Sequence, residues 1–544
     1  MPPGEIDRIP PEGLRSALAA WRARLGEADV CDGSPAQSRY GISTTGIERL
    51  IAAALRPRSV DDVVAAVGIA HQFSVPLYPI STGNNWGYGS AVPAAEGCVI
   101  LDLSRLDRIV AVDPGLGLVT VEPGVTQQRL SEFLDDRRLP FLVPVTGAGP
   151  DCSLVGNALE RGYGITPYAD HFGAVMALEA ILPDGRLYRS AIAELGGTSV
   201  DRAYKWGIGP YLDGLFAQGG FGIVTQMTIA LAPRPQCIEA FLFTLKNDAD
   251  LEAAVGAVQQ ILRRLGGISG SINLMNRHRV LAMTVPYPHD RIDESGQLPA
   301  AVVAELARDN QVAAWTGFGA LYGEFGVVAA GRRALRGILN RAGMKPRFVA
   351  PEKIAAVARW TARIMGLRGS WLSRQAQTLS AAMALIAGKP SRVALPLAYW
   401  QTQTTRPPEA HLNPAADGCG LIWYSPLVPM RPADASEYVA MVNEVCARHA
   451  IEPLITLTSL SDRCFDSSVP LLFDRRNPEE TAQAHTCYRA LLDAGQAKGF
   501  LPYRIGVNAM DWLVRPGLPC WDMIAAIKSA VDPRHIISPG RYGC

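Results

Sequence analysis

The chain of 544 residues is too long for one hydrophobic core, so we expect two or more domains. Hydrophobic residues make up 48% of the chain and charged residues 19%, and a formal net charge of +1 gives no reason to expect nucleic acid or an anionic membrane as a partner. No apolar run approaches the roughly 20 residues that span a bilayer, and residues 1–5 lack the features of a secretory signal.

Predicted helices and strands alternate over the first 235 residues, as in an α+β domain. A helical patch covers residues 14–25, and Ser59 begins a capping box ahead of a helix with buried positions at 63–70. Thr126 is the expected N-cap of another helix. Apolar runs between turns predict strands at residues 76–80, 98–103, 109–112, 118–122, 176–182, 186–190 and 221–231.

A glycine-rich loop over residues 79–90 follows the first of these strands. It reads P-I-S-T-G-N-N-W-G-Y-G-S and contains neither G-x-G-x-x-G nor the lysine of a Walker motif. Few side chains cover its backbone N–H groups, and its hydroxyl and amide side chains add hydrogen bonds, which suits a phosphate or pyrophosphate. Taken alone, the loop fits an ordinary turn between two strands equally well.

A second glycine-bearing stretch, residues 147–168, is predicted to be a long loop. A structureless segment of that length inside a domain usually binds something. Pro233-Arg234-Pro235 then marks a boundary, because the pattern changes after it to strand–helix–strand.

Two β-α-β units are predicted beyond this boundary, at residues 240–275 and 421–457, and we expect them to be pseudo-repeats of one α+β domain. The segment between them, about 285–395, reads as helical and irregular. Asn477 and Pro478 are the N-cap and first residue of a last long helix. The turn-rich end, residues 536–544, is expected to rejoin the first domain, so that the region between is an insertion.

Five motifs occur in an order that one flavoprotein family shares. They are P-I-S-T-G-N-N-W-G-Y-G-S, V-E-P-G-V-T, V-G-N-A-L-E-R-G-Y-G-I-T-P-Y-A-D-H-F, K-W-G-I-G-P-Y-L-D-G-L-F and I-S-P-G-R-Y-G. From about residue 58 onward the chain resembles the vanillyl-alcohol oxidase and p-cresol methylhydroxylase family. The resemblance implies an α+β fold: a two-subdomain FAD-binding domain formed by residues 1–235 and 500–544, with an inserted α+β cap domain, residues 236–499, that carries the substrate site.

The same resemblance assigns the glycine-rich loop to the FAD pyrophosphate. An anionic dinucleotide in a largely apolar slot needs backbone donors and at least one cation, which the matching residues supply. The residues expected to line the cofactor are Ser81, Thr82, Gly83, Asn84, Asn85, Tyr88, Pro123, Gly124, Gly156, Asn157, Gly162, Gly222, Ile223, Val224, Arg504 and Arg541.

Members of the family oxidise para-substituted phenols, such as 4-alkylphenols and 4-hydroxybenzyl alcohols, by removing a hydride from the benzylic carbon. The resulting p-quinone methide adds water or loses a proton. Tyr88, Tyr503 and Arg504 match the residues that hold the phenolate. Lowering a phenol pKa by about three units, or about 4 kcal/mol, is within reach of one charged and two neutral donors. Asp170 matches the family's acidic residue beside the flavin, where a general base is expected.

Each of these residues also fits a structural role. Tyr88 alone fits an aromatic side chain packed on a turn, and Asp170 alone fits a helix cap. Tyr503 and Arg504 are adjacent, and neighbours in a strand face opposite ways, so their convergence requires a bend after Pro502.

The chain departs from the family pattern in the cap domain. Leu421 stands where members with histidyl-linked FAD have the linking histidine, while Tyr399 and Tyr424 remain candidates for a tyrosyl link. We therefore expect non-covalent FAD. Asp466-Ser467 stands where two adjacent histidines are common, which predicts a substrate other than vanillyl alcohol or p-cresol.

We therefore expect an FAD-dependent oxidase or dehydrogenase of para-substituted phenols, with oxygen or a cytochrome as electron acceptor. Two alternatives stay open: the flavoprotein subunit of a cytochrome-linked hydroxylase, which residues 477–481 resemble, and a biosynthetic tailoring enzyme for a larger substrate. The ten cysteines form no C-x-x-C pair and the eight histidines no metal spacing, so we expect free thiols, a cytoplasmic protein and no metal site. The resemblance also implies a homodimer.

Overall fold

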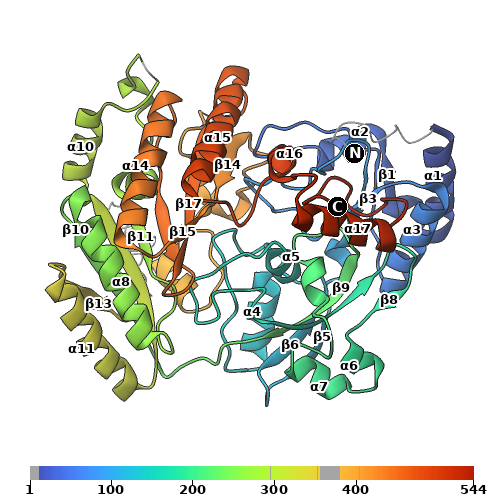
Figure 1. Ribbon diagram of the computed structural model, residues 1–544, viewed down its shortest axis with the longest axis horizontal. Coiled ribbons are helices and arrows are strands. Elements are labelled where there is room, and N and C mark those ends of the chain that lie inside the picture. The colour runs from blue at the N-terminus through green and yellow to red at the C-terminus, as the bar shows by residue number, and fades with distance from the viewer. Residues whose placement is uncertain (1–10, 295, 352, 356–379, 404) are drawn as a thin grey trace.

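The computed structural model describes residues 11–294, 296–351, 353–355, 380–403 and 405–544. Residues 1–5, on which the expected lack of a secretory signal rests, lie outside this range. The chain forms two lobes side by side: one holds the N-terminal strands and the C-terminus, the other a large sheet with long helices (Figure 1). No helix among the described residues is long and apolar enough to cross a membrane.

The first sheet of the first lobe has four strands in the order β1-β2-β4-β3. Strands β2, β4 and β3 are parallel, whereas β1 pairs antiparallel with β2. The Ser59 hydroxyl accepts a hydrogen bond from the Asp62 N–H at 3.2 Å, as the predicted cap requires. The elements of this part are α1 (Pro11–Leu25), η1 (Glu27–Asp29), β1 (Val30–Asp32), α2 (Gly33–Tyr40), β2 (Ala53–Leu55), α3 (Val60–Phe73), β3 (Leu77–Ile80), β4 (Val99–Asp102) and η2 (Leu103–Arg105).

The second sheet of this lobe has five strands in the order β5-β6-β9-β7-β8, all paired antiparallel. Its predicted strands are present, and Thr126 caps helix α4 as expected. The elements are β5 (Ile109–Asp113), β6 (Leu118–Val121), α4 (Gln127–Asp136), α5 (Leu154–Leu159), β7 (Val175–Ile181), β8 (Leu187–Tyr188), α6 (Ala191–Glu194), α7 (Thr198–Ala203), η3 (Asp213–Phe216) and β9 (Ile223–Ala230).

The segment 147–168 is not the continuous loop that was predicted, because it contains the short helix α5. Ser153 caps this helix by accepting from the Gly156 N–H at 3.0 Å, and its hydroxyl donates to the Pro123 carbonyl at 2.6 Å. The helix is six residues long, too short to show an apolar period in the sequence. It nevertheless fixes the position of this whole segment.

The second lobe is built on an eight-stranded sheet in the order β13-β10-β12-β11-β16-β17-β14, with β15 paired to β17. The predicted β-α-β units are present as β10-α8-β11 and β14-α14-β16, and they meet where β11 pairs antiparallel with β16. Strands β12 and β17 were not predicted. In the sheet β12 lies between β10 and β11, and β17 lies between β16 and β14, so the two halves have matching strand orders. The strands are β10 (Cys237–Leu245), β11 (Asn273–Asn276), β12 (Trp315–Gly323), β13 (Arg347–Val349), β14 (Cys419–Tyr424), β15 (Leu427–Pro429), β16 (Thr456–Ser459) and β17 (Cys464–Asp474).

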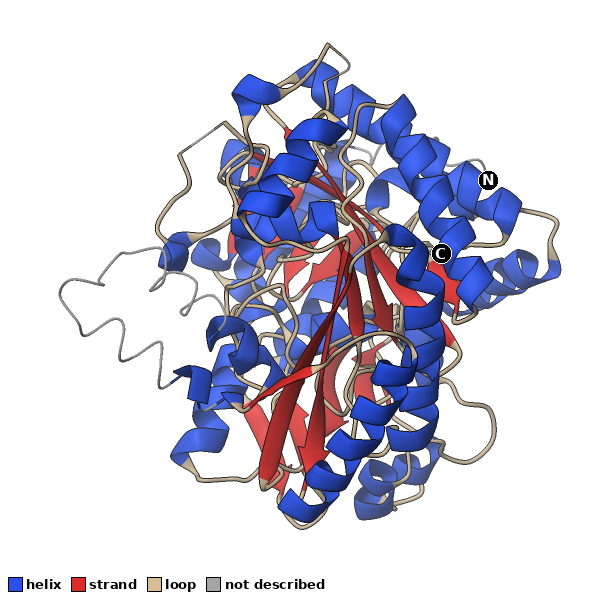
Figure 2. Cartoon of the chain, turned by 90° about the vertical axis from the view of Figure 1, so that its left-hand side faces the viewer, coloured by secondary structure: helices blue, strands red, loops and turns tan. Residues whose placement is uncertain are grey.

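Long helices pack on this sheet and contribute to one continuous core, in which α8 and α14 lie against each other (Figures 1 and 2). Asn477 and Pro478 begin the last long helix, as predicted. The segment predicted as helical and irregular, 285–395, lies partly outside the described residues; its described part contains η5, α10, β12, α11, β13 and part of η6. The helices are η4 (Asp248–Asp250), α8 (Leu251–Leu265), α9 (Arg277–Thr284), η5 (His289–Arg291), α10 (Ala300–Asp309), α11 (Phe325–Arg341), η6 (Leu395–Tyr399), η7 (Glu409–His411), α14 (Pro432–Arg448) and α15 (Pro478–Lys498).

The C-terminal segment returns to the first lobe, as predicted, through η8 (Val507–Ala509), α16 (Met510–Leu513) and α17 (Pro519–Val531). Ile537 forms a parallel bridge with Leu77 at the edge of β3. The buried ammonium of Lys528 binds the Asp532 carboxylate at 2.6 Å and the carbonyls of Gly220 and Ile537 at 2.6 and 2.7 Å. Because these bonds use all three ammonium protons, they hold the C-terminal segment against the start of β9.

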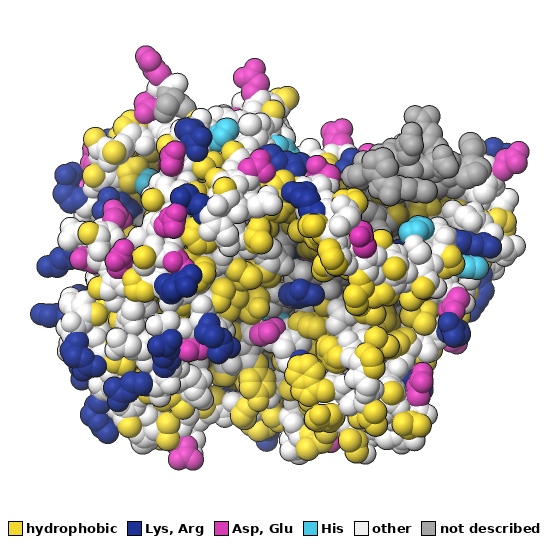
Figure 3. Space-filling view, viewed as in Figure 1, with side chains coloured by type: hydrophobic (Ala, Val, Ile, Leu, Met, Phe, Trp, Pro, Cys, Tyr) yellow, Lys and Arg dark blue, Asp and Glu magenta, His cyan; other side chains and the backbone are white. Residues whose placement is uncertain are grey.

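The visible face of the molecule carries basic and acidic side chains intermixed (Figure 3). Large apolar side chains are exposed along α6, α7 and the following turn, at Leu195, Val200, Tyr204, Trp206, Ile208 and Leu212.

Candidate functional site

A cavity of about 420 Å³ lies between the lobes, and both contribute to its wall. The first lobe supplies the loop after β3, the α5 segment and the C-terminal turn. The second lobe supplies α9, η6, β14 and β17. A cavity of this size with a few convergent charged groups is the usual form of a ligand site.

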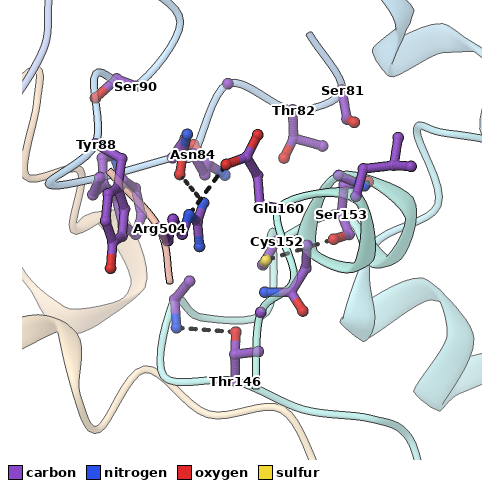
Figure 4. Close-up of a pocket in the computed structure, with 18 of the residues that line it drawn as sticks. Ser81, Thr82, Asn84, Tyr88, Ser90, Thr146, Cys152, Ser153, Glu160 and Arg504 are labelled. Carbon is purple, nitrogen blue, oxygen red and sulfur yellow. Dashed lines mark hydrogen bonds and ion pairs between the residues drawn. The ribbon is translucent and has the colours of Figure 1, made fainter. Parts of the chain in front are cut away.

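The glycine-rich loop 81–85 forms one wall of this cavity (Figure 4). Gly83 has a φ of 72°, a conformation that suits glycine. The backbone N–H groups of residues 82–85 donate to no described backbone acceptor. A loop whose donors are unused inside the protein fits an anionic phosphate group.

Helix α5 completes this cradle from the other side. A Cβ on Gly156 would lie 2.7 Å from the Ser81 hydroxyl, so glycine lets the first turn of α5 approach the loop without displacing the Ser81 side chain. Asn157 lines the cavity and contacts the ring of buried His171, whose pKa is lowered to about 4 by burial. The residues present therefore fit an FAD molecule whose pyrophosphate lies between the loop and α5.

All but two of the residues predicted to hold FAD line the cavity; Gly124 and Ile223 do not. Gly124 packs against a turn instead, since its N–H donates to the Leu106 carbonyl at 2.7 Å and an added Cβ would lie 2.3 Å from the Ser104 carbonyl oxygen. Ile223 is 1% exposed in the core of the first lobe, while Val224 faces the cavity. Because successive side chains of β9 face opposite ways, Ile223 points into the core and Val224 into the cavity.

Two arginines of the C-terminal segment share one carboxylate in the cavity wall. Arg504 donates from Nε to Glu160 at 3.1 Å (Figure 4) and also contacts the Asn85 amide oxygen. Arg541 pairs with the other oxygen of Glu160 and with the Tyr78 hydroxyl. Glu160 therefore neutralises part of the charge of both guanidinium groups and fixes their positions.

Tyr88, Tyr503 and Arg504 all line the same cavity. The Arg504 guanidinium lies over the Tyr88 ring, 4.1 Å from its centroid. The bend expected beyond Pro502 is present, and it brings the adjacent side chains of Tyr503 and Arg504 to one side. The Tyr88 hydroxyl lies 2.6 Å from the Ser425 hydroxyl.

Burial raises the pKa of Tyr88 to about 12 and the pKa of Tyr503 well above its ordinary value. The nearby Asp466 carboxylate contributes to both shifts, whereas Arg504 opposes them. Both hydroxyls therefore keep their protons at neutral pH and can donate hydrogen bonds to a bound oxyanion.

Asp466 is a buried carboxyl in the cavity wall, and its Oδ1 atom has no hydrogen-bond partner among the described residues. Burial raises its pKa to about 7, against the opposing charge of Arg504. Its neighbour Ser467, predicted to share the floor of the site, faces away, because successive residues of β17 alternate.

Asp170 does not line the cavity. It is exposed, and its carboxylate accepts a hydrogen bond from the Gly173 N–H at 2.8 Å. The prediction that Asp170 is the general base therefore has no geometric support: the carboxylate caps a turn. Asp466 is the acidic side chain that lies beside Tyr88 and Tyr503.

Neither tyrosine considered for covalent attachment lines the cavity. The Tyr399 hydroxyl donates to Asp417, and the Tyr424 hydroxyl is buried beside Gly495 of α15. Leu421 does line the cavity and has no nucleophilic atom. Among the described residues, no group of His, Cys, Asp or Glu is arranged to hold a metal ion.

Two charged residues of the cavity, Glu160 and Arg279, had no role assigned from the sequence, and Asp466 was linked to substrate choice without a chemical role. Glu160 lay within a quoted motif. Asp466 interrupts a strand that is otherwise largely apolar, which is a visible signal once β17 is recognised. Arg279 follows Arg277 and His278 at the start of α9, where cations oppose the helix dipole.

Comparison with known proteins agrees with this site. Residues 51–191 match the model of an FAD binding domain. The chain is 36% identical over 97% of its length to 1'-carboxy-chondrochloren decarboxylase of Chondromyces crocatus, and it covers 97% of that protein. It is 28% identical over 97% of its length to the 4-cresol dehydrogenase [hydroxylating] flavoprotein subunit of Pseudomonas putida, of which it covers 95%. A crystal structure of p-cresol methylhydroxylase with substrate bound superimposes with a TM-score of 0.86 at 26% identity, covering 100% of this chain and 98% of the other.

These likenesses span nearly the full length of each chain, and the cradle fits the cofactor they share. The protein belongs to the vanillyl-alcohol oxidase and p-cresol methylhydroxylase family of FAD-dependent oxidoreductases.

Proposed function

We propose that the protein oxidises a para-substituted phenol by removing a hydride from its benzylic carbon. The observation that carries this proposal is the convergence of Tyr88, Tyr503 and Arg504 on one wall of the cavity. Two neutral hydroxyl donors and one guanidinium form an oxyanion site for a phenolate. Bound FAD supplies the hydride acceptor.

The phenolate matters because its negative oxygen supplies the electron density that leaves with the hydride. Arg504 provides the positive charge and the two tyrosines provide neutral hydrogen bonds, all in a site from which water is largely excluded. Their combined preference for the ionised phenol is expected to lower its pKa by about three units, or about 4 kcal/mol.

Asp466 is placed to take the proton that the phenol loses. A carboxylate with a pKa of about 7 is close in proton affinity to a phenol stabilised in this way, so transfer between them is nearly balanced. When water adds to the quinone methide, its hydroxyl group bonds to the benzylic carbon and its remaining proton goes to the phenol oxygen as the ring regains aromaticity. The proton that Asp466 took from the phenol is then released to solvent.

The test is anaerobic mixing of the flavin-loaded protein with 4-ethylphenol while the flavin absorbance is followed. We expect the flavin to bleach, and we expect Arg504→Ala to slow the bleaching by about 10²- to 10³-fold. The matched controls are 3-ethylphenol, which cannot form a quinone methide, and 4-ethylanisole, which cannot form a phenolate. Equal bleaching by either control, or no bleaching with any para-substituted phenol, would contradict the proposal.

A second candidate is oxidative decarboxylation of a larger phenol, favoured by the relative whose name describes a decarboxylase and which matches over 97% of both chains. After hydride loss, the quinone methide can accept the electron pair of a C–COO⁻ bond on the next carbon. That bond breaks, CO₂ leaves, a carbon–carbon double bond forms and the ring returns to a phenolate. Release of labelled CO₂ from carboxyl-labelled 3-(4-hydroxyphenyl)propionate distinguishes this outcome from addition of water.

The electron acceptor is proposed to be either oxygen or a cytochrome. One relative is named as the flavoprotein subunit of a dehydrogenase, which favours a separate acceptor protein. Steady oxygen consumption by the purified protein would exclude a strict need for a cytochrome.

A further inference from the structure

The charged side chains that line the cavity fall into two groups. Among the described residues they are Arg279, Arg504, Arg541, Glu160 and Asp466. Arg504 and Arg541 share Glu160, and Asp466 lies within the electrostatic reach of Arg504. Arg279 has no acidic partner among the described residues.

Arg279 is a cation held where a cation is unfavourable. Its Nε and Nη1 atoms are buried and form no hydrogen bond with a described residue. It also lies in the first turn of α9, which contains no acidic residue, so the positive end of the helix adds to its charge. Burial lowers its pKa only to about 10, so the guanidinium stays charged at neutral pH. Arg279 as a whole is half-buried, and a charge with buried, unpartnered donors destabilises a protein unless a ligand pairs with it.

Arg279 has different neighbours from Arg504, the arginine of the proposed phenolate site. Its guanidinium lies 5.6 Å from the centroid of the Trp423 ring. The Trp423 backbone N–H donates to the Gly87 carbonyl at 3.1 Å, and Gly87 precedes Tyr88, over whose ring Arg504 lies. The guanidinium groups of Arg279 and Arg504 therefore contact two different aromatic rings, Trp423 and Tyr88. The neighbouring wall of the second lobe is apolar, at Leu397, Ala398, Pro414 and Leu421.

We propose that Arg279 binds a carboxylate on the para side chain of the substrate, so that the preferred substrates are 4-hydroxyphenyl compounds with an acidic side chain. An arginine fork matches a carboxylate in shape and charge. The proposal rests on the function proposed above, because it takes the Arg504 end as the phenolate site. The phosphates of FAD are the competing partner, but their cradle is the loop 81–85 and α5 of the first lobe.

The test uses equilibrium binding, so that it does not depend on turnover. 4-Hydroxycinnamate and its neutral amide have nearly the same shape, and neither has a saturated benzylic carbon to lose a hydride. Each is titrated calorimetrically into the flavin-loaded protein. We expect the acid to bind about 10- to 100-fold more tightly than the amide. Arg279→Met is expected to remove this preference, with less than about a threefold change for the amide, and Arg279→Lys to restore part of it.

Flavin content and amide affinity show whether the variant is folded. Binding of the acid no more tightly than the amide by the native protein would overturn the proposal, and so would a preference that survives in Arg279→Met. Loss of flavin from the variant would assign Arg279 to the cofactor and would also overturn it. If the preference depends on Arg279 but no para-substituted phenol, 4-ethylphenol and 3-(4-hydroxyphenyl)propionate included, bleaches the flavin, the carboxylate site stands and the proposed oxidation falls.

Discussion

The two ends of the cavity treat charge differently. At one end, Glu160 pairs with both Arg504 and Arg541, so each guanidinium has an acidic partner before anything binds. At the other end, Arg279 has no acidic partner among the described residues, and its Nε and Nη1 atoms form no hydrogen bond with them. The Glu160 ion pairs are expected to stabilise the fold, whereas under our proposal a substrate carboxylate pairs with Arg279.

The largest expected effect comes from breaking the ion pairs of Glu160 with Arg504 and Arg541. Glu160→Gln leaves two largely buried guanidinium groups without their shared carboxylate, and we expect the free energy of unfolding to fall by about 3–5 kcal/mol. Thermal or chemical denaturation measures this change. The control is Glu437→Gln, which breaks an exposed ion pair with Lys498 and should cost less than about 1 kcal/mol. Similar losses for both variants would show that Glu160 does not hold this cluster together.

The next effect concerns the proton acceptor. Asp466→Asn removes a general base, so kcat with a para-substituted phenol is expected to fall by about 10²- to 10³-fold. In the native protein kcat/KM should rise as the pH passes through about 7, where the Asp466 carboxyl ionises, and this inflection should be absent in the variant. A variant that keeps the same pH profile would assign the inflection to another group.

Asp466 also makes a prediction about stability. Its pKa in the folded protein is raised, so the folded state binds more protons than the unfolded state between about pH 4 and 7. Stability is therefore expected to decrease as the pH rises through this window, by at most about 4 kcal/mol. Comparing the melting temperatures of native protein and Asp466→Asn at pH 5 and pH 8 measures this, and the variant should lose less stability than the native protein.

A smaller effect is expected from Tyr88→Phe. The change removes one neutral hydrogen bond to the phenolate and leaves the ring under Arg504, so kcat/KM should fall about 10-fold while flavin binding is kept. Tyr438→Phe is a suitable control, because this tyrosine is buried in the second lobe and does not line the cavity. Equal losses in the two variants would mean that the Tyr88 hydroxyl has no special role.

The smallest effect concerns Arg279, which has no acidic partner among the described residues. Arg279→Met removes a half-buried charge without a partner, so the free energy of unfolding of the substrate-free protein should rise by about 1 kcal/mol. Arg541→Met is the matched change at an arginine that pairs with Glu160, and it should lower the free energy of unfolding. Denaturation of the two variants side by side measures the difference in sign, and a loss of stability in both would show that Arg279 has a partner inside the protein.

The sequence predicted the cofactor side of the site better than the substrate side. The expected role of the loop 81–85 depends on its glycine-rich backbone, which is visible in a short stretch of sequence, and the motif that contains Gly156 is equally short. Asp170 shows the limit of this reasoning: its motif matched the family, but the turn that contains it points the carboxylate to solvent.

By itself, the sequence determined the α+β alternation, the capped helices, the glycine-rich cradle and the family, because each is expressed in short stretches of residues. Only the tertiary structure decided which charges share the cavity. Glu160, Arg279, Asp466 and Arg504 come from four distant segments, and their pairing depends on how the eight-stranded sheet and the C-terminal return place those segments around one space. Electrostatic balance is a property of distances across that space, so no local pattern could show that Arg279 lacks the carboxylate that Arg504 has.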